Sequence, residues 1–293
     1  MPKPKKNQVV TPQPQADKLA RALGLTMPLY LKREDLHPLK SHKGRSLPPM
    51  IDHYLKFGHS NFVISSSGNA ALAAGLYLKK INSSQKNKIN LKIFVGKKIP
   101  ADKIKPLQAL TNKNITIVQV TNPKQSAFLA QKQGAVLLRQ SLDNLAPKGY
   151  ADLYDELRRI KELKTIFIPT SSGTTLAGLF MASKGKIQLN IVQTDFCHPF
   201  VKSNLPTPQK SLAGAIVDKV GHRKTEVLKA LKKSKGAGYV ADDWDIKNAI
   251  KLAYKTEKIK LSPNSALALV GLLHALIKGW QPKGAIALLI TGK

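Results

Sequence analysis

Short apolar runs alternate with amphipathic segments along most of this chain. The apolar runs are rich in Ile, Val, Leu and Phe, and they predict β-strands over 29–31, 61–64, 91–95, 115–120, 135–138, 165–168, 190–193 and 285–290. Apolar residues at three- and four-residue spacing predict helices over 17–23, 47–57, 70–80, 103–110, 125–132, 150–163, 175–183, 224–231, 244–254 and 265–278. Such alternation favours an α/β fold with mainly parallel sheets, and Gly149 is a candidate crossing point between two domains.

Charge adds a second strong feature. The chain has 48 Lys and Arg against 17 Asp and Glu, a net charge of +31, which attracts polyanions. The densest basic stretch, 223–235, has no interleaved aromatic residue that could stack on bases, and no zinc-finger spacing or RNA-binding aromatic signature occurs. We therefore interpret the charge as a solvated, lysine-rich surface and expect weak, non-specific polyanion binding.

Other residue counts exclude several classes of protein. A single cysteine, Cys197, rules out an intramolecular disulfide and a cysteine-based zinc site, and the histidines show no metal-ligand spacing, so we expect no metal. Cys197 and His198 are adjacent, which favours a packed or loop pair over a nucleophile and its base. The basic start, 1–6, is not followed by the apolar segment of a secretory signal, and no apolar run is long enough for a membrane span. We expect a cytoplasmic protein.

Candidate chemistry begins at Lys43, which follows the predicted strand 29–31 and a turn. Lys40, His42 and Arg45 surround it, and neighbouring positive charge favours the deprotonated amine that a Schiff base requires. Most lysines in so basic a chain are simply solvated. The local sequence therefore leaves both roles open for Lys43.

Two small-residue turns each lie between a predicted strand and a helix. The first is Ser65-Ser66-Ser67-Gly68-Asn69, and the second is Thr170-Ser171-Ser172-Gly173-Thr174-Thr175. Helix N-termini attract anions, and hydroxyl and amide side chains add donors, although ordinary helix capping explains the same residues. The second turn has the higher density of hydroxyls and is the better phosphate site. It lacks the Gly-Lys-Ser/Thr pattern of nucleotide triphosphatases.

Together, and in this order, these segments resemble pyridoxal-phosphate enzymes of the tryptophan-synthase β-subunit type (fold type II), with threonine synthase nearest in motif. Ser41-His42-Lys43 resembles their Schiff-base motif, Ser66-Ser67-Gly68-Asn69 their Ser-x-Gly-Asn loop, and Ser265-Ala266-Leu267 the helix before the last strand. The resemblance covers nearly the whole chain. It departs at Gly44, where many relatives have Asp, and in the single glycine, Gly173, of the second turn.

The resemblance implies a role for each matched residue. Lys43 would bind the aldehyde of pyridoxal 5'-phosphate and act as the base. Asn69 would bind the phenolic oxygen of the cofactor, while Ser66, Ser67, Gly68 and Asn69 would bind the substrate carboxylate. The phosphate would be held by Ser171, Ser172, Gly173, Thr174 and Thr175. Thr291, after the last strand, would bind the ring nitrogen.

The implied fold has two three-layer α/β domains with a cofactor cleft between them: a larger cofactor-binding domain, 1–45 plus 146–293, and a smaller mobile domain, 46–145. The implied activity is elimination or replacement on a small amino acid, with a threonine-synthase-like lyase as the first hypothesis. A serine/threonine dehydratase or a cysteine-synthase-like enzyme is the alternative. A catalytically inactive, basic relative that binds nucleic acid or another polyanion is the alternative of another class, and assembly as a homodimer is left open.

Overall fold

The computed structural model describes residues 9–84 and 88–292. The basic start of the chain lies outside these ranges. The chain divides into two compact units, 1–37 with 150–293 and 38–149. Lys43 belongs to the second of these units. Among the described residues, no helix combines the length and the apolar character needed to cross a membrane.

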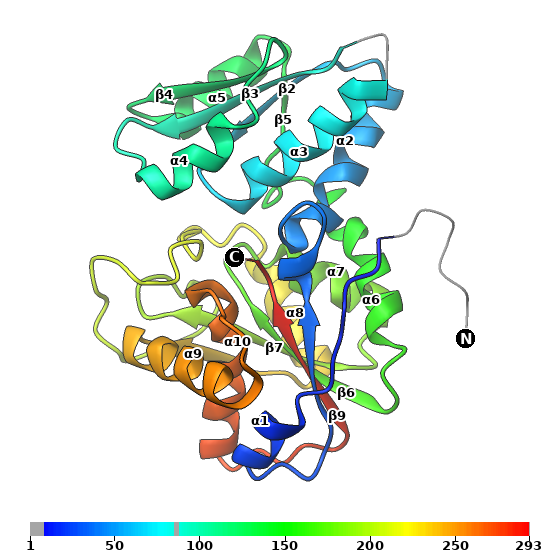
Figure 1. Cartoon of the computed structure of the whole chain (residues 1–293), viewed down its shortest axis with the longest axis vertical. Coiled ribbons are helices and arrows are strands. Elements are labelled where there is room, and N and C mark those ends of the chain that lie inside the picture. The colour runs from blue at the N-terminus through cyan, green and yellow to red at the C-terminus, as the bar shows by residue number, and fades with distance from the viewer. Residues whose placement is uncertain (1–8, 85–87, 293) are drawn as a thin grey trace. The chain divides into compact units, whose positions relative to one another are not determined.

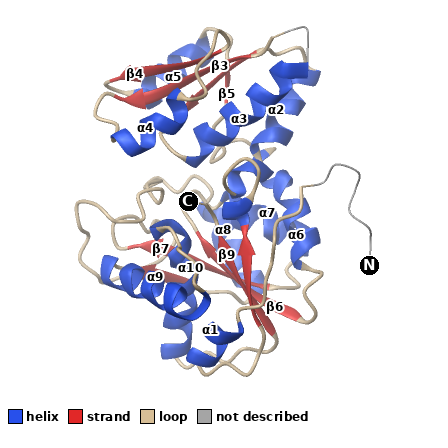
Figure 2. Cartoon of the chain, viewed as in Figure 1, coloured by secondary structure: helices blue, strands red, loops and turns tan. Residues whose placement is uncertain are grey.

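The first unit is built on a five-stranded sheet of order β1-β9-β6-β7-β8 in which all neighbouring strands are parallel (Figures 1 and 2). Its strands are β1 (Leu29–Arg33), β6 (Leu163–Pro169), β7 (Gln188–Thr194), β8 (Gly238–Ala241) and β9 (Ala285–Ile290). Its helices are α1 (Asp17–Ala22), α6 (Ala151–Leu157), α7 (Thr174–Ser183), α8 (Lys224–Ser234), α9 (Asp243–Glu257) and α10 (Pro263–Ile277), with the 3₁₀ turn η1 (Glu34–Leu36).

Alternation along β9 shows how this sheet is covered. Ile286, Leu288 and Ile290 pack into one core with α1, α9 and α10, whereas Ala287 and Leu289 pack into a second core with α6, α7 and α8. Successive side chains of a strand point to opposite faces, so a strand that is apolar at every position must be covered on both. The result is the three-layer α/β arrangement that the sequence predicted.

The second unit has a four-stranded parallel sheet of order β4-β3-β2-β5. Its strands are β2 (Asn61–Ser65), β3 (Asn90–Gly96), β4 (Ile115–Val120) and β5 (Val136–Leu137). Its helices are α2 (Leu47–Lys56), α3 (Asn69–Ser84), α4 (Ala101–Gln108) and α5 (Pro123–Lys132), with the 3₁₀ turns η2 (His42–Arg45) and η3 (Ala146–Tyr150), the latter ending one residue into the first unit. Phe62 and Ile64 of β2 face a core shared with α2 and α3, and Val63 faces a smaller core with α5. This unit is also a three-layer structure with a parallel sheet.

Two predictions from the sequence were wrong in detail. Helix α6 ends at Leu157 rather than at 163, because the chain turns there, with Glu162 at φ 56°, and enters β6 at Leu163. Strand β8 was not predicted. Its first residue is glycine, and a Cβ atom at Gly238 would lie 2.4 Å from a methyl carbon of Val201, so packing there favours a residue without a side chain.

A buried ion pair in the first unit holds the beginning of the described chain in place. Lys32 of β1 and Glu156 of α6 are at most 1% exposed, and Lys32 Nζ lies 2.5 Å from Glu156 Oε2. The same amine donates to the Thr11 carbonyl oxygen at 2.8 Å, and the Thr11 amide donates to Glu156 Oε2 at 3.0 Å. Thr11 Oγ1 also donates to Glu34 Oε1. Buried charges need such partners, and this set supplies them.

Candidate functional site

The hydroxyl-rich turn of the first unit lies between β6 and α7 and depends on Gly173. This residue precedes the first turn of α7 with φ 80° and ψ −3°, a left-handed conformation that favours glycine. A Cβ atom there would lie only 2.4 Å from Val227 Cγ2 of helix α8. Both the backbone angle and the packing therefore require glycine, and together they fix where the helix begins.

The start of α7 offers several hydrogen-bond donors to an anion. The N-cap residue of this helix is Gly173, which has no side chain with which to cap the N-terminus. Ser172 Oγ and Thr174 Oγ1 lie 2.8 Å apart beside it, and Thr174 and Thr175 are buried. The helix dipole adds a favourable potential for negative charge. This donor set fits a phosphate group, and the cradle has no room for a side chain at Gly173.

Ser171 differs from its neighbours. Its Oγ accepts hydrogen bonds from the backbone amides of Val217 at 3.1 Å and Asp218 at 3.3 Å. Both amides belong to the long loop between β7 and α8. The Ser171 oxygen is therefore used to fasten this loop to the turn, a role that the sequence could not indicate, because it depends on a contact far along the chain.

Thr291 follows β9, the sheet neighbour of β6, and is 4% exposed. Parallel neighbours end at the same edge of a sheet, so Thr291 and the turn after β6 lie along one edge of this unit. Its Oγ1 lies 3.5 Å from Ser265 Oγ at the start of α10. Ser265 Oγ and Ser262 Oγ also donate to the Gly292 carbonyl oxygen, at 2.7 Å and 2.6 Å.

Ser262 and Ser265 are therefore supporting residues to which sequence reasoning gave no role. Ser262 also caps α10 by accepting from the Ser265 amide at 3.3 Å. The signal was present in the sequence as Ser-Pro-x-Ser, a pattern typical of a helix start. The pattern could not show that Gly292, far along the chain, lies beside this helix start. Because both serines donate to its carbonyl oxygen, the helix cap also fixes the residue next to Thr291.

Lys43 lies in the second unit, in the 3₁₀ turn η2. Ser41 precedes this turn, is fully buried, and accepts a hydrogen bond from the Lys43 amide at 3.3 Å. Lys43 itself is half-buried. The turn contacts α2 and α3, so its backbone is held by two helices.

The predicted Ser-x-Gly-Asn loop belongs to the same unit. It follows β2, and Asn69 is the first residue of α3. Ser66 Oγ accepts from the Gly68 amide at 3.3 Å, while Ser66, Ser67 and Asn69 are half-buried and Gly68 is exposed. Lys43 and this loop are thus both linked to α3. The predicted residues form two sets, one within each unit.

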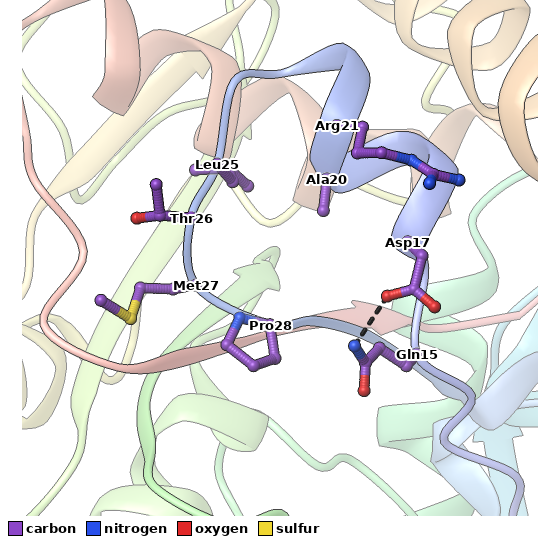
Figure 3. A pocket seen from close by; sticks show the side chains of 8 residues that line it. All are labelled: Gln15, Asp17, Ala20, Arg21, Leu25, Thr26, Met27 and Pro28. Atoms are coloured by element: carbon purple, nitrogen blue, oxygen red, sulfur yellow. Dashed lines mark hydrogen bonds between the residues drawn. The ribbon is translucent and has the colours of Figure 1, made fainter.

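Two other features are separate from these sets. Burial raises the pKa of the Cys197 thiol, and His198 Nδ1 lies 2.9 Å from the Val201 carbonyl oxygen, so this adjacent pair is not arranged as nucleophile and base. A shallow pocket lies around α1 (Figure 3), where Gln15 Nε2 donates to Asp17 Oδ1 at 2.6 Å. It includes Pro28, which precedes β1, and therefore lies by the amino end of that strand, away from the edge that carries Thr291.

Comparison with known proteins identifies the family of this chain. The family described as "Pyridoxal-phosphate dependent enzyme" matches residues 5–292. Threonine synthases of Mycobacterium bovis and Mycobacterium tuberculosis are 24% identical over 304 residues, covering 96% of this chain and 80% of theirs.

Solved structures share the fold at lower identity. Maize serine racemase has a TM-score of 0.79 at 20% identity, covering 96% of this chain and 87% of its own. The processed form of threonine deaminase isoform 2 from Solanum lycopersicum has a TM-score of 0.79 at 21% identity, covering 97% and 84%. A pyridoxal 5'-phosphate-dependent aspartate racemase reaches 0.82 at 16% identity, covering 97% and 90%. Since the family match spans almost the whole chain, this protein belongs to the pyridoxal-phosphate dependent enzymes, whose members bind pyridoxal 5'-phosphate.

Proposed function

We propose that this protein catalyses elimination or replacement on a small amino acid, as a threonine-synthase-like lyase that uses pyridoxal 5'-phosphate. The observation that carries the proposal is the hydroxyl-lined start of α7, which follows the left-handed Gly173 and shares one sheet edge with buried Thr291. Such an edge is where parallel α/β sheets bind ligands. When bound, the cofactor supplies an electron sink for negative charge at the substrate α-carbon.

The residues of the first unit would hold the cofactor. The first amides of α7 and the hydroxyls of Ser172, Thr174 and Thr175 would bind its phosphate, with Gly173 giving close backbone approach. Ser171 would act by fastening the loop at Val217. Thr291 would donate to the ring nitrogen. A neutral hydroxyl partner leaves that nitrogen without a counter-charge, which favours elimination and replacement over transamination.

The residues of the second unit would carry the reaction. Lys43 would hold the cofactor aldehyde in the resting enzyme, and its free amine would then move the proton at the substrate α-carbon. Ser66, Ser67 and Gly68 would bind the substrate carboxylate through side chains and the start of α3. Asn69 would bind the phenolic oxygen of the cofactor. We propose that both sets of residues act on one cofactor molecule, and that the smaller unit is the mobile one.

The choice of substrate rests on relatives. Threonine synthases at 24% identity favour a phosphorylated homoserine. The fold neighbours are named as a threonine deaminase and a serine racemase, so a dehydratase is the second candidate. Release of inorganic phosphate from O-phosphohomoserine, compared with keto-acid formation from serine or threonine, distinguishes the two.

The test of the cofactor role is borohydride reduction followed by peptide mass spectrometry. We expect one modified peptide, carrying reduced cofactor on Lys43, and none in Lys43→Ala. Lys40→Ala is the matched control, because Lys40 is an exposed lysine three residues away, and we expect it to label like the parent. Modification at another lysine would contradict the assignment of Lys43, and no modification in the parent would favour the inactive relative.

A further inference from the structure

One face of α9 carries basic and aromatic side chains that no part of the proposed enzyme function uses. Six exposed residues recur along it at spacings that place them on one side of a helix, and we name them the α9 stripe: Trp244, Lys247, Lys251, Tyr254, Lys255 and Lys258. The opposite face packs through Ile246, Ala249 and Ala253 into the core shared with α10 (Figure 1). The stripe is thus the solvent face of a well-anchored helix.

Carboxylates of this helix are engaged elsewhere. Asp243 accepts from Ser211 Oγ at 2.9 Å and from the Leu212 amide at 2.8 Å. Asp245 belongs to the capping box of α9 and pairs with His274 of α10 at 3.1 Å. Glu257 accepts from the Leu19 amide at 2.7 Å. None of these three acidic residues is on the stripe, so its four lysines form a row of one sign.

The aromatic residues flank or interrupt this row. Trp244 is 71% exposed and Tyr254 49% exposed, which is unusual for side chains that bury large apolar areas when they find a partner. Lys258 Nζ lies 5.7 Å from the centre of the Tyr254 ring. From Lys247 to Lys258 the helix rises about 16 Å, a length that reaches several phosphates of an extended strand. Rings beside lysines allow bases to stack while phosphates are neutralised.

We propose that the α9 stripe is a binding surface for single-stranded nucleic acid. Charge complementarity selects a polyanion, and the two exposed rings select one with aromatic bases. A second copy of this chain does not fit, because paired stripes would bring eight like charges together. The basic stretch 223–235 differs, since α8 exposes lysines without an aromatic residue. The sequence alone indicated a solvated surface with weak, non-specific polyanion binding, because the densest basic stretch has no interleaved aromatic residue.

The test uses the full chain loaded with cofactor and a fluorescein-labelled oligothymidylate, followed by fluorescence anisotropy at several salt concentrations. The α9 variant combines Lys247→Gln, Lys251→Gln, Lys255→Gln and Lys258→Gln. The matched α8 control combines Lys224→Gln, Lys229→Gln, Lys232→Gln and Lys233→Gln, four lysines that are also exposed. Both variants lose the same charge, so only the position of the lysines differs.

We expect the α9 variant to weaken binding by more than about tenfold and to lower the slope of log K against log salt by about 2, as several phosphate contacts are lost. The α8 control is expected to change affinity by no more than about twofold. Equal losses in the two variants would overturn the proposal, because the binding would then follow net charge alone. Circular dichroism and cofactor absorbance establish that both variants are folded and loaded.

The aromatic arm of the test separates stacking from charge. Trp244→Ala is expected to weaken oligothymidylate binding by about tenfold, and Trp244→Phe to restore most of it. Parent-like affinity in Trp244→Ala would overturn the proposal. So would stronger competition by heparin, which has no bases, or by phosphatidylserine vesicles, which would indicate a lipid surface. Binding by the stripe is independent of the reaction, so we expect Lys43→Ala, which loses the covalent link to the cofactor, to bind oligothymidylate like the parent.

Discussion

Gly173 is the residue whose requirement the structure explains most fully. Its left-handed φ of 80° is a backbone conformation that strains any residue with a side chain. In addition, a Cβ atom there would lie only 2.4 Å from Val227 Cγ2 and clash with it. The sequence indicated a hydroxyl-rich turn with one glycine. It could not indicate the contact with Val227, because that contact depends on how α8 packs against α7.

Replacing Gly173 with Ala tests both reasons. The left-handed backbone costs a residue with a Cβ atom about 1–2 kcal/mol, and the clash adds to this. We expect a lower melting temperature and weaker binding of pyridoxal 5'-phosphate, measured by thermal unfolding and fluorescence titration. Adding Val227→Ala should recover the part of these losses that the clash with Val227 causes.

Gly96→Ala is the control for this substitution, because a Cβ atom there meets nothing within 4 Å. A parent-like stability and cofactor affinity in Gly173→Ala would show that the turn adapts without strain. The position would then not define the cradle.

Thr291 is the second residue that carries a prediction. Thr291→Val keeps the shape of this buried side chain and removes its hydroxyl. A ring nitrogen left without its donor weakens binding or turnover by about 1–3 kcal/mol. We therefore expect a larger loss in kcat than in the free energy of unfolding, with Thr291→Ser close to the parent. Equal kinetics and equal cofactor absorbance in the parent and Thr291→Val would show that the hydroxyl does not face the ring.

At the scale of elements, hydrophobic periodicity predicted most helices and strands. It did so because the strands of a parallel sheet are apolar on both faces and each covering helix is apolar on the one face that it turns to the sheet. It failed where apolar residues continue a pattern beyond the element. Ile160 is buried at helical spacing after Leu157, but it lies in the turn that leads to β6. It also failed at β8, a strand of four residues that begins with Gly238 beside Val201 and is too short for a clear alternation.

The junction of α9 and α10 carries a pH-dependent ion pair. Burial raises the pKa of the Asp245 carboxyl, but the hydrogen bond and charge of His274 outweigh it, so the pKa lies below its ordinary value. The Asp245 carboxylate therefore binds a proton less tightly in the folded state than in the unfolded chain. The stabilisation is present above about pH 4 and is lost as the pH falls through the lowered pKa.

We expect Asp245→Asn to lower the free energy of unfolding by about 1 kcal/mol or less near pH 6, and the difference from the parent to shrink near pH 3. Urea unfolding at the two pH values measures it. In a His274→Gln background the pH dependence due to the ion pair should be lost, and only the effects of burial and of the Asp242 amide on Asp245 remain. A difference that stays constant from pH 6 to pH 3 would exclude the ion pair as its cause.

For the molecule as a whole, the sequence predicted the fold class but not the sheet order, since the pairing of β1 with β9 joins residues about 250 positions apart. Nor did it predict the buried Lys32–Glu156 pair, whose partners come from different elements. Local patterns indicate which face of an element is apolar. They do not indicate which distant element covers that face.

The strand order of the first unit has a consequence for synthesis of the chain. The preceding segment bridges one edge of β1 through Gln15 and Tyr30, and β9 pairs with the other edge. Strand β9 leaves the ribosome roughly 250 residues later, so at translation rates of about 5–20 residues per second β1 waits about 10–50 seconds for it. All four strands of the other unit emerge in that interval and can complete their sheet. Until β9 arrives, the edge of β1 that β9 covers in the folded sheet stays open, and open strand edges can pair with neighbouring chains. The nascent protein therefore depends on chaperones most while its smaller unit is already folded.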